Sequence, residues 1–377
     1  MLVPFIIGVL AVLFAYLAQN KGAEKCLLLS FLIITAFSAL RYNYGPDYLP
    51  YFEFYEMINA YEGSIFDFNY IESVTNKGEY GWTYINVLCR SIGYFGLIIV
   101  MAIFQNAVIY IFVKKNVPSK WWWFSVFIYF FCSRYFFIGS CSTYRQWTAA
   151  CIFVIASQFI ANKKPIPYFL LILGASFIHK SALILLPVYF VSYIKVRQVS
   201  QKNIAFVLVG LVAANIIFPR VLSSNLNALF AGNSLEDYAL YVGSGNIQSY
   251  SSNLFGMISL YVKDYIFPLM GFYYLRKEDN VYLKVITMLA LLSLFVLPFA
   301  SVIPMANRFA MYFYIFNLAV CPMAISRMLK DKQYSGIASI FLLIFVLFAM
   351  REFYSFFDSR MGEYFRSYQT IFSVPWK

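Results

Sequence analysis

The side chains best suited to chemistry are arginines placed where apolar segments begin or end. Arg41 follows one apolar run, while Arg145 and Arg308 each open another, far apart in the sequence. The planar guanidinium group matches phosphate geometry better than a lysine ammonium does. If the fold brings these arginines together, they form a binding site for an anionic ligand such as a diphosphate.

Three further residues are candidate bases that could accept a proton from a hydroxyl group. They are Asp47, Glu79 and His179, which is the single histidine of the chain. Each also has a plainer role that the sequence leaves open. Asp47 would hold an Asx-type turn, Glu79 would cap the short helix expected after it, and His179 would be a hydrogen-bonded packing residue.

Aromatic side chains accompany several of these charged groups. Tyr48 and Tyr51 lie in the stretch "DYLPYFEFY", and Tyr312 lies one helical turn after Arg308. Because tyrosine faces pack well on the C–H surfaces of sugars, we expect these three rings to contact a sugar. Aromatic residues make up 21% of the chain, so the aromatic pattern is not specific by itself.

The elements that position these residues are predicted to be membrane-spanning helices. Hydrophobic residues make up 62% of the chain and charged residues 12%, about half the charged fraction of a soluble domain. We predict an all-α polytopic integral membrane protein with about 12 transmembrane helices in a single domain, 1–377. The expected spans are 3–18, 26–40, 93–113, 121–138, 142–160, 165–178, 181–194, 203–218, 254–275, 281–301, 308–326 and 335–351, with a short interfacial or re-entrant helix over 82–92.

The positions of the basic residues predict which helix ends face the cytoplasm. Lys and Arg gather in alternate loops, and cytoplasmic loops carry such an excess. Both ends of the chain are then external, as are two large loops at about 41–80 and 219–253. The segment 165–194 is basic at both ends, so it forms either two short helices or a re-entrant hairpin that turns at His179.

This topology gathers several ionisable groups at the outer leaflet. The plain interpretation is that each one snorkels to lipid headgroups or anchors a helix end, and for Arg134 and Lys180 we favour it. For the three arginines named first we favour binding, because each has polar or aromatic neighbours suited to a ligand. The groups at this leaflet are Arg41, Arg134, Arg145, His179, Lys180 and Arg308.

The ligand that these groups imply is an anion reached from outside and partly within the membrane, which fits a lipid-linked diphosphate. No GxxxxGK[ST], GxGxxG or HExxH motif is present, and the six cysteines show no metal-ligand spacing. We therefore expect no cofactor and no metal. The net charge of +12 lies largely in membrane-flanking loops, so nucleic acid is not an expected partner.

Five stretches of the chain resemble the EpsG-type exopolysaccharide and O-antigen polymerases, the Wzy functional class. They occur in family order across most of the chain, with Gly45-Pro46-Asp47 where the family usually has Gly-Thr-Asp. The stretches are "RYNYGPDYLPY" from Arg41, "EYGWTYINVL" from Glu79, "YRQWTAACIF" from Tyr144, "ASFIHKSALILLPVYF" from Ala175 and "NRFAMYFYIF" from Asn307.

The resemblance implies a membrane glycosyltransferase that works at the periplasmic face of a bacterial inner membrane. Such a polymerase joins undecaprenyl-diphosphate-linked oligosaccharides as donor and acceptor, and a chain-length-regulating co-polymerase is a suggested partner besides membrane lipids. We assign Arg145 and Arg308 to the diphosphate, with Arg41 assisting them or bracing Asp47. Asp47 or Glu79 is the acceptor-side base, with His179 as the alternative.

Two other functions remain open from the sequence. An O-antigen ligase-like transferase would use the same donor with a lipid A-core acceptor. A flippase or transporter of the lipid-linked glycan would favour ionisable residues near the bilayer midplane and an internal repeat. Neither feature is evident in the sequence, so transport ranks below glycosyl transfer.

Overall fold

The computed structural model separates the chain into two compact units, which are described separately. The first unit comprises Met1–Ser192 and Ala349–Lys377, and the second comprises Tyr193–Phe348. The expected external loop 219–253 and Arg134 lie outside the described residues. The structure describes residues 1–60, 67–75, 78–132, 136–194, 202–203, 205–214, 217, 259, 261–275, 278–300, 306–359 and 362–373.

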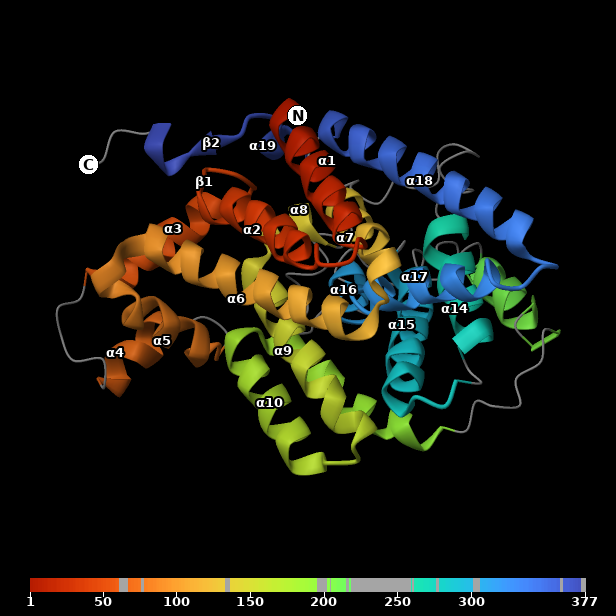
Figure 1. The fold of residues 1–377 in the computed structure, drawn as a ribbon. Helices are drawn as coiled ribbons and strands as arrows, with labels where there is room; N and C mark the ends of the chain where they lie inside the picture. Colours follow the sequence, from red (N-terminus) through yellow and green to blue (C-terminus); the bar gives the residue numbers. More distant parts are fainter. Residues whose placement is uncertain are drawn as a thin grey trace. The chain divides into compact units, whose positions relative to one another are not determined.

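The described part of the chain is almost entirely helical, which confirms the all-α prediction (Figure 1). Its strands are two residues each, β1 (Arg41–Tyr42) and β2 (Gln369–Thr370). They pair antiparallel, with Arg41 opposite Thr370. This short ladder attaches the segment that follows α18 to the start of the expected external loop at 41–80.

Helices of the first unit follow the predicted spans closely at most positions. In this unit α2 packs between α1 and α6, α6 packs on α9, and α9 packs on α10. The helices are α1 (Leu2–Leu17), α2 (Lys25–Ala39), α3 (Tyr48–Asn59), α4 (Phe68–Val74), α5 (Tyr80–Leu88), α6 (Gly93–Asn116), α7 (Trp122–Phe131), α8 (Phe137–Ser142), α9 (Tyr144–Ala161), α10 (Pro165–Ile178), the 3-10 helices η1 (Arg90–Ile92), η2 (Ser119–Trp121), η3 (Lys180–Tyr193) and η5 (Ile371–Ser373), and α19 (Glu363–Arg366).

The second unit contains the remaining helices, except that the last part of α18, from Ala349, belongs to the first unit. Two predicted spans in this unit differ from single straight α-helices. The span expected at 308–326 is two helices, α16 and α17, bent by 47° at their junction; Pro322 lies inside α17 and therefore does not mark the bend. In the span expected at 254–275, the described run 261–275 begins with a π-helix. The elements are η4 (Tyr261–Ile266), α14 (Phe267–Leu275), α15 (Val281–Ala300), α16 (Ala306–Tyr314), α17 (Asn317–Met328) and α18 (Ser335–Asp358).

Two helices in the described part are long and apolar enough to cross a membrane, Arg90–Asn116 and Ser335–Asp358. The bent pair of α16 and α17 counts as a third if it is one broken span. Shorter apolar helices cover most of the other predicted spans, whereas the span expected at 121–138 is divided between α7 and α8. The total of about 12 spans remains a prediction.

The chain turns at His179, as the basic flanks of this segment predicted. His179 follows α10 in an extended conformation, with φ −149° and ψ 112°. Beyond it η3 runs back along α10, since the Tyr168 hydroxyl donates to the Leu185 carbonyl at 2.6 Å and the Tyr168 and Tyr189 rings lie 5.4 Å apart. Residues on the two sides of His179 are thus in contact, so His179 lies at the tip of a hairpin.

Close packing of α5 against this hairpin depends on Gly81. A Cβ atom at Gly81 would lie 2.9 Å from the Cβ of Phe177 and 3.1 Å from its carbonyl carbon. Because backbone atoms limit how far the neighbour can shift, only glycine allows this approach of α5 to the end of α10. The approach brings the residue before α5, Glu79, next to His179.

Gly81→Ala is therefore expected to lower the stability of the detergent-solubilised protein by about 1–3 kcal/mol, because the added methyl group overpacks this contact. Gly174→Ala in α10 is the matched control, since a Cβ at Gly174 meets no atom within 4 Å. The control is expected to leave the thermal unfolding midpoint unchanged or slightly raised. Equal midpoints for Gly81→Ala and the wild type would contradict the packing argument.

Candidate functional site

The carboxylate of Glu79 joins three segments that are distant in the sequence. Its Oε2 atom accepts a hydrogen bond from Arg145 Nη1 at 2.7 Å, and its Oε1 atom lies 2.8 Å from His179 Nδ1. The backbone N–H of Lys180 also donates to Oε1, at 2.9 Å. Both carboxylate oxygens are therefore occupied by groups from α9 and from the α10–η3 hairpin.

Local structure places each of these groups at the end of a helix. Glu79 precedes the first residue of α5 but makes no side-chain cap bond, so its carboxylate is available for tertiary contacts. Arg145 is the second residue of α9. His179 and Lys180 occupy the tip of the hairpin, where the break between α10 and η3 frees the Lys180 N–H from helical bonding.

The environment of Glu79 keeps its carboxylate ionised. Burial by itself favours the protonated acid, but the His179 hydrogen bond, the charge of Arg145 and the Lys180 N–H together outweigh it and lower the pKa of Glu79. Only 8% of the Glu79 side chain is exposed. An ionised carboxylate with both oxygens occupied is suited to positioning Arg145 and His179.

Arg145 is held between Glu79 and an aromatic slot. Its guanidinium carbon lies 4.9 Å from the centre of the Tyr51 ring and 5.8 Å from that of Trp82. Its Nε also donates to the Tyr51 hydroxyl at 3.1 Å. A quarter of the Arg145 side chain is exposed, so the cation is fixed in orientation while remaining accessible.

Arg41, in contrast, is a buried cation that lies against Tyr144, whose ring packs against Tyr51. It is 3% exposed, and its guanidinium carbon lies 5.7 Å from the centre of the Tyr144 ring. Its Nη1 donates to the Ser38 carbonyl at the end of α2, while its Nε has no hydrogen-bond partner among the described residues. The described part of the chain contains no ion pair between Arg41 and Asp47.

Asp47 lies at the position before α3, after a turn that requires Gly45. Gly45 has φ +106°, a conformation that disfavours other residues. The Asp47 side chain makes no cap bond to α3; instead its Oδ2 accepts a hydrogen bond from Ser142 Oγ at 2.9 Å. The Asx-type turn considered from the sequence is therefore replaced by a contact with the end of α8.

The tyrosines expected to bind sugar have different surroundings. Tyr51 contacts Arg145 and is partly exposed, whereas Tyr48 is 2% exposed and packs edge-on against Tyr94 with ring centres 5.4 Å apart. In the second unit Tyr312 is fully buried and Arg308 is exposed on the same helix, α16. Of the site residues predicted from the sequence, Arg145, His179 and Tyr51 therefore lie together around Glu79.

Trp82 and Tyr144 are site residues that the sequence analysis did not select. Their rings lie 5.4 Å apart, and each also packs against Tyr51. Trp82 contributes to the aromatic slot of Arg145. The signal was present, since each lies within three residues of a selected charged residue, but the general abundance of aromatic residues obscured it.

A buried charged pair in the second unit was also missed. Lys263 Nζ lies 3.6 Å from Asp264 Oδ1, both side chains are 3% exposed, and the Tyr314 hydroxyl donates to the same carboxylate oxygen. The pair lies on the π-helix η4, within the predicted span 254–275. Ionisable residues inside an apolar span are the signal that would have found it.

The described residues contain no group of three or more His, Cys, Asp or Glu side chains that could hold a metal ion. Comparison with known proteins gives one family: the sequence model of the EpsG family matches residues 24–370. No curated protein and no solved structure matches the chain. The family match covers the first-unit site and the described part of the second unit.

Replacing Glu79 by glutamine is expected to cost about 2–3 kcal/mol of stability at neutral pH, less than a fully buried pair because Arg145 is partly exposed. The pKa of Glu79 is lowered from 4.5 on folding, so this stabilisation is present above about pH 4.5 and lost as the pH falls through the folded-state pKa. The difference between wild type and Glu79→Gln should therefore shrink in acid.

Thermal unfolding in a non-ionic detergent at a series of pH values measures this difference. Glu53→Gln, which removes an exposed acid from α3, is the matched control and should follow the wild-type curve. A gap between wild type and Glu79→Gln that stays constant, or grows, as the pH falls would contradict the ion-pair account.

Proposed function

This chain belongs to the EpsG family, and from that premise we propose that it is a polysaccharide polymerase of the bacterial inner membrane. In this proposal it joins undecaprenyl-diphosphate-linked oligosaccharide repeat units by glycosyl transfer at the periplasmic face. The observation that carries the proposal is the Glu79 carboxylate, which fixes a partly exposed arginine and a histidine side by side.

Arg145 is the group that we assign to the diphosphate of the donor. Its Nη1 and Nε donate to Glu79 and Tyr51. Among the described residues Nη2 has no hydrogen-bond partner, and a guanidinium has five N–H donors, so we assign Nη2 to the ligand. A fixed cation stabilises the charge that develops on the leaving diphosphate without reorganising during the reaction. The face of the Tyr51 ring beside Arg145 would also pack against the first sugar of the donor.

Among the three candidate bases, the geometry favours His179. Its Nδ1 contacts Glu79, and a carboxylate at this nitrogen favours the tautomer with the proton on Nδ1 and the lone pair on Nε2. Glu79 is fully occupied and has a lowered pKa, so we assign it the role of a positioning residue. Asp47 retains one carboxylate oxygen beyond its Ser142 contact and is the alternative base.

The proposed step forms one bond and breaks one. The acceptor hydroxyl attacks the anomeric carbon of the donor glycan while Nε2 of His179 takes its proton. The bond between that carbon and the phosphate oxygen breaks, and undecaprenyl diphosphate leaves with the electron pair. The remaining requirement is to hold two amphiphilic substrates in line, which is a matter of positioning.

The other predicted residues keep supporting roles in this proposal. Arg41 is too buried to face a substrate directly and would add positive potential through the Tyr144 ring. Arg308, exposed at the start of α16, would contribute to diphosphate binding, with Tyr312 supporting its helix. A chain-length-regulating co-polymerase remains a proposed partner.

Arg145→Ala and Arg308→Ala are each expected to slow chain extension by about 100-fold or more, because removing a group that stabilises developing charge has effects of that size. The measurement uses the purified full chain with defined lipid-linked repeat units and follows glycan length. Arg327→Ala is the matched control, since Arg327 is also paired with a glutamate, Glu278, at 2.8 Å. Wild-type rates for both variants would remove the diphosphate assignment.

The identity of the base is tested in the same assay with His179→Gln and Asp47→Asn. Loss of a general base lowers the rate by about 100- to 10,000-fold, so His179→Gln should fall in this range while Asp47→Asn stays within a few-fold of wild type. The reverse pattern would transfer the base role to Asp47. Extension that occurs only when lipid A-core is added would instead identify a ligase.

A further inference from the structure

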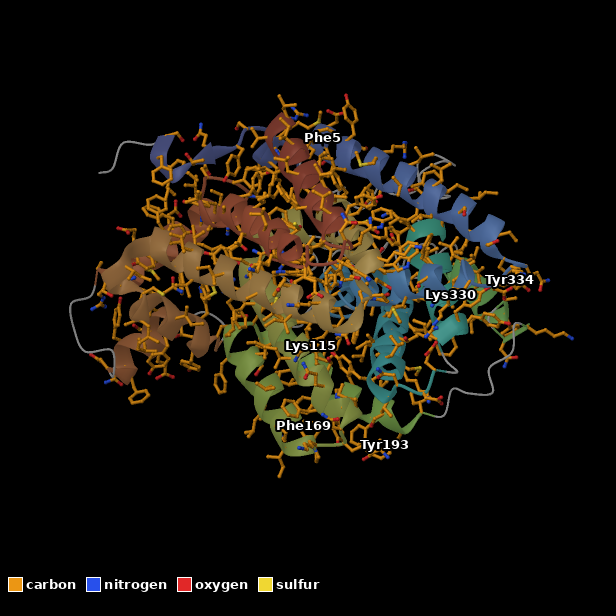
Figure 2. All side chains as sticks on the ribbon, in the orientation of Figure 1. Phe5, Lys115, Phe169, Tyr193, Lys330 and Tyr334 are labelled. Carbon is orange, nitrogen blue, oxygen red and sulfur yellow. The ribbon has the colours of Figure 1, made fainter. Side chains whose placement is uncertain are left out.

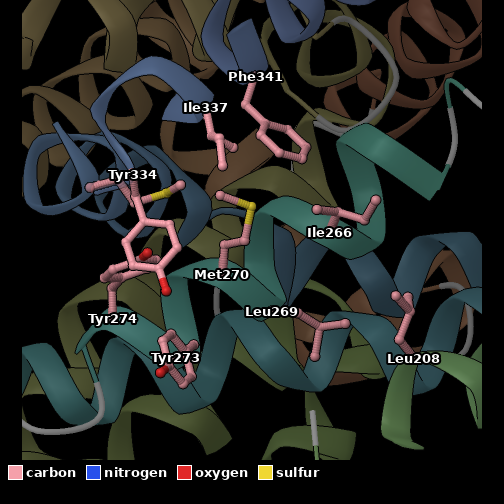
Figure 3. Close-up of a pocket in the computed structure, with 10 residues that line it drawn as sticks. Leu208, Ile266, Leu269, Met270, Tyr273, Tyr274, Tyr334, Ile337 and Phe341 are labelled. Atoms are coloured by element: carbon pink, nitrogen blue, oxygen red, sulfur yellow. The ribbon is translucent and has the colours of Figure 1, made fainter. Parts of the chain in front are cut away.

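The second unit contains a cavity of about 350 Å³ that the glycosyl-transfer site does not use. It lies among η4, α14, α17 and α18, together with the described segment 205–214 (Figure 3). Its lining is formed almost entirely by aliphatic and aromatic side chains, among them Leu208, Ile266, Leu269, Met270, Ile337 and Phe341.

The size and lining of the cavity suit a hydrocarbon chain. Small-molecule sites measure about 300–1,000 Å³, and this cavity lies at the lower end of that range, which is enough room for one hydrocarbon chain. Ile337 lines the cavity and is 47% exposed, so the cavity reaches the surface of the unit. That surface belongs to α18, a helix apolar enough to cross a membrane, and the opening therefore faces lipid.

One end of the cavity is marked by three tyrosines. Tyr273, Tyr274 and Tyr334 lie together at the end opposite Leu208 in Figure 3. The Tyr274 and Tyr334 rings meet edge to face, with centres 6.5 Å apart and planes at 76°. Tyrosines gather where hydrocarbon meets the polar headgroups, so this end lies at the membrane surface.

Two exposed lysines lie close in sequence to residues that line the cavity. Lys330 and Lys332 lie in the connection between α17 and α18, each two residues from a lining residue, Met328 and Tyr334 respectively. Figure 2 labels Lys330 and Tyr334. Both lysines are exposed.

The other charged groups at this connection are Arg327 and Asp331. Arg327 is paired with Glu278, and the Asp331 carboxylate accepts the Gln333 N–H at 3.0 Å. Asp331 keeps its negative charge in this hydrogen bond, so the connection presents two exposed lysines and one exposed acid, and its net charge towards a ligand is positive.

We propose that this cavity binds an anionic phospholipid, with one acyl chain inside it and the phosphate beside Lys330 and Lys332. The combination of an apolar cavity, a tyrosine end and adjacent lysines matches the two parts of such a lipid, and basic sites on the cytoplasmic side of membrane helices recognise anionic headgroups. The loop after α17 is on that side by its charge. The site does not depend on the glycosyl-transfer assignment.

Native mass spectrometry of the full chain, purified in a mild detergent, tests the proposal with added phosphatidylglycerol and phosphatidylcholine of identical acyl chains. Phosphatidylglycerol should bind about tenfold more tightly, and the double variant K330Q/K332Q should lose that preference. Lys115→Gln, another exposed lysine (Figure 2), is the control and should keep it. Met270→Trp, which fills the cavity, should weaken both lipids, whereas Ile340→Trp on the exposed face of α18 should not.

Three results would overturn the proposal. The first is equal binding of the two phospholipids by wild type, and the second is an unchanged preference in K330Q/K332Q. The third is displacement of bound phosphatidylglycerol by equimolar undecaprenyl phosphate, which would make the cavity an isoprenoid site. If Met270→Trp does not fold, the surface variant K330Q/K332Q still decides the question.

Discussion

The carboxylate of Glu79 is the interaction on which the site of the first unit depends. It meets Arg145 and His179 at 2.7 and 2.8 Å and accepts the Lys180 N–H, so one side chain joins the starts of α5 and α9 to the tip of the α10–η3 hairpin. A buried charge is tolerated only when it is paired and hydrogen-bonded. Glu79 meets this requirement because one carboxylate oxygen is paired with Arg145 and the other is bonded to His179 and the Lys180 N–H. The same contacts fix the orientation of Arg145 and His179.

The packing around this carboxylate explains why the contacts can form. Gly81 allows α5 to approach the backbone of Phe177, which brings the residue before α5 to the hairpin tip. The aromatic rings of Tyr51 and Trp82 also pack against the guanidinium of Arg145. The result is one arrangement in which a partly exposed cation and an imidazole lie beside each other, and among the described residues the imidazole Nε2 has no hydrogen-bond partner.

The helices were largely predictable from the sequence, because apolar runs set their positions and basic flanks forced the chain to turn at His179. The bend between α16 and α17 was not, since no proline or glycine marks it. Charge placement selected Arg145, His179 and Glu79 individually, but Glu79 lies 66 and 100 residues from its two partners, and only tertiary packing chooses those pairs. The same packing gave Asp47 a partner in Ser142 and buried Tyr48, outcomes that residue type alone does not determine.

The central claim is that Glu79 and His179 act as one unit in chain extension, and a double-mutant cycle measures this most directly. Initial rates of glycan extension by the purified protein are compared for Glu79→Gln, His179→Gln and the double variant. Residues that act together are strongly non-additive, so the account predicts that the double variant is no slower than the slower single variant. A loss in the double variant equal to the product of the two single losses would contradict it.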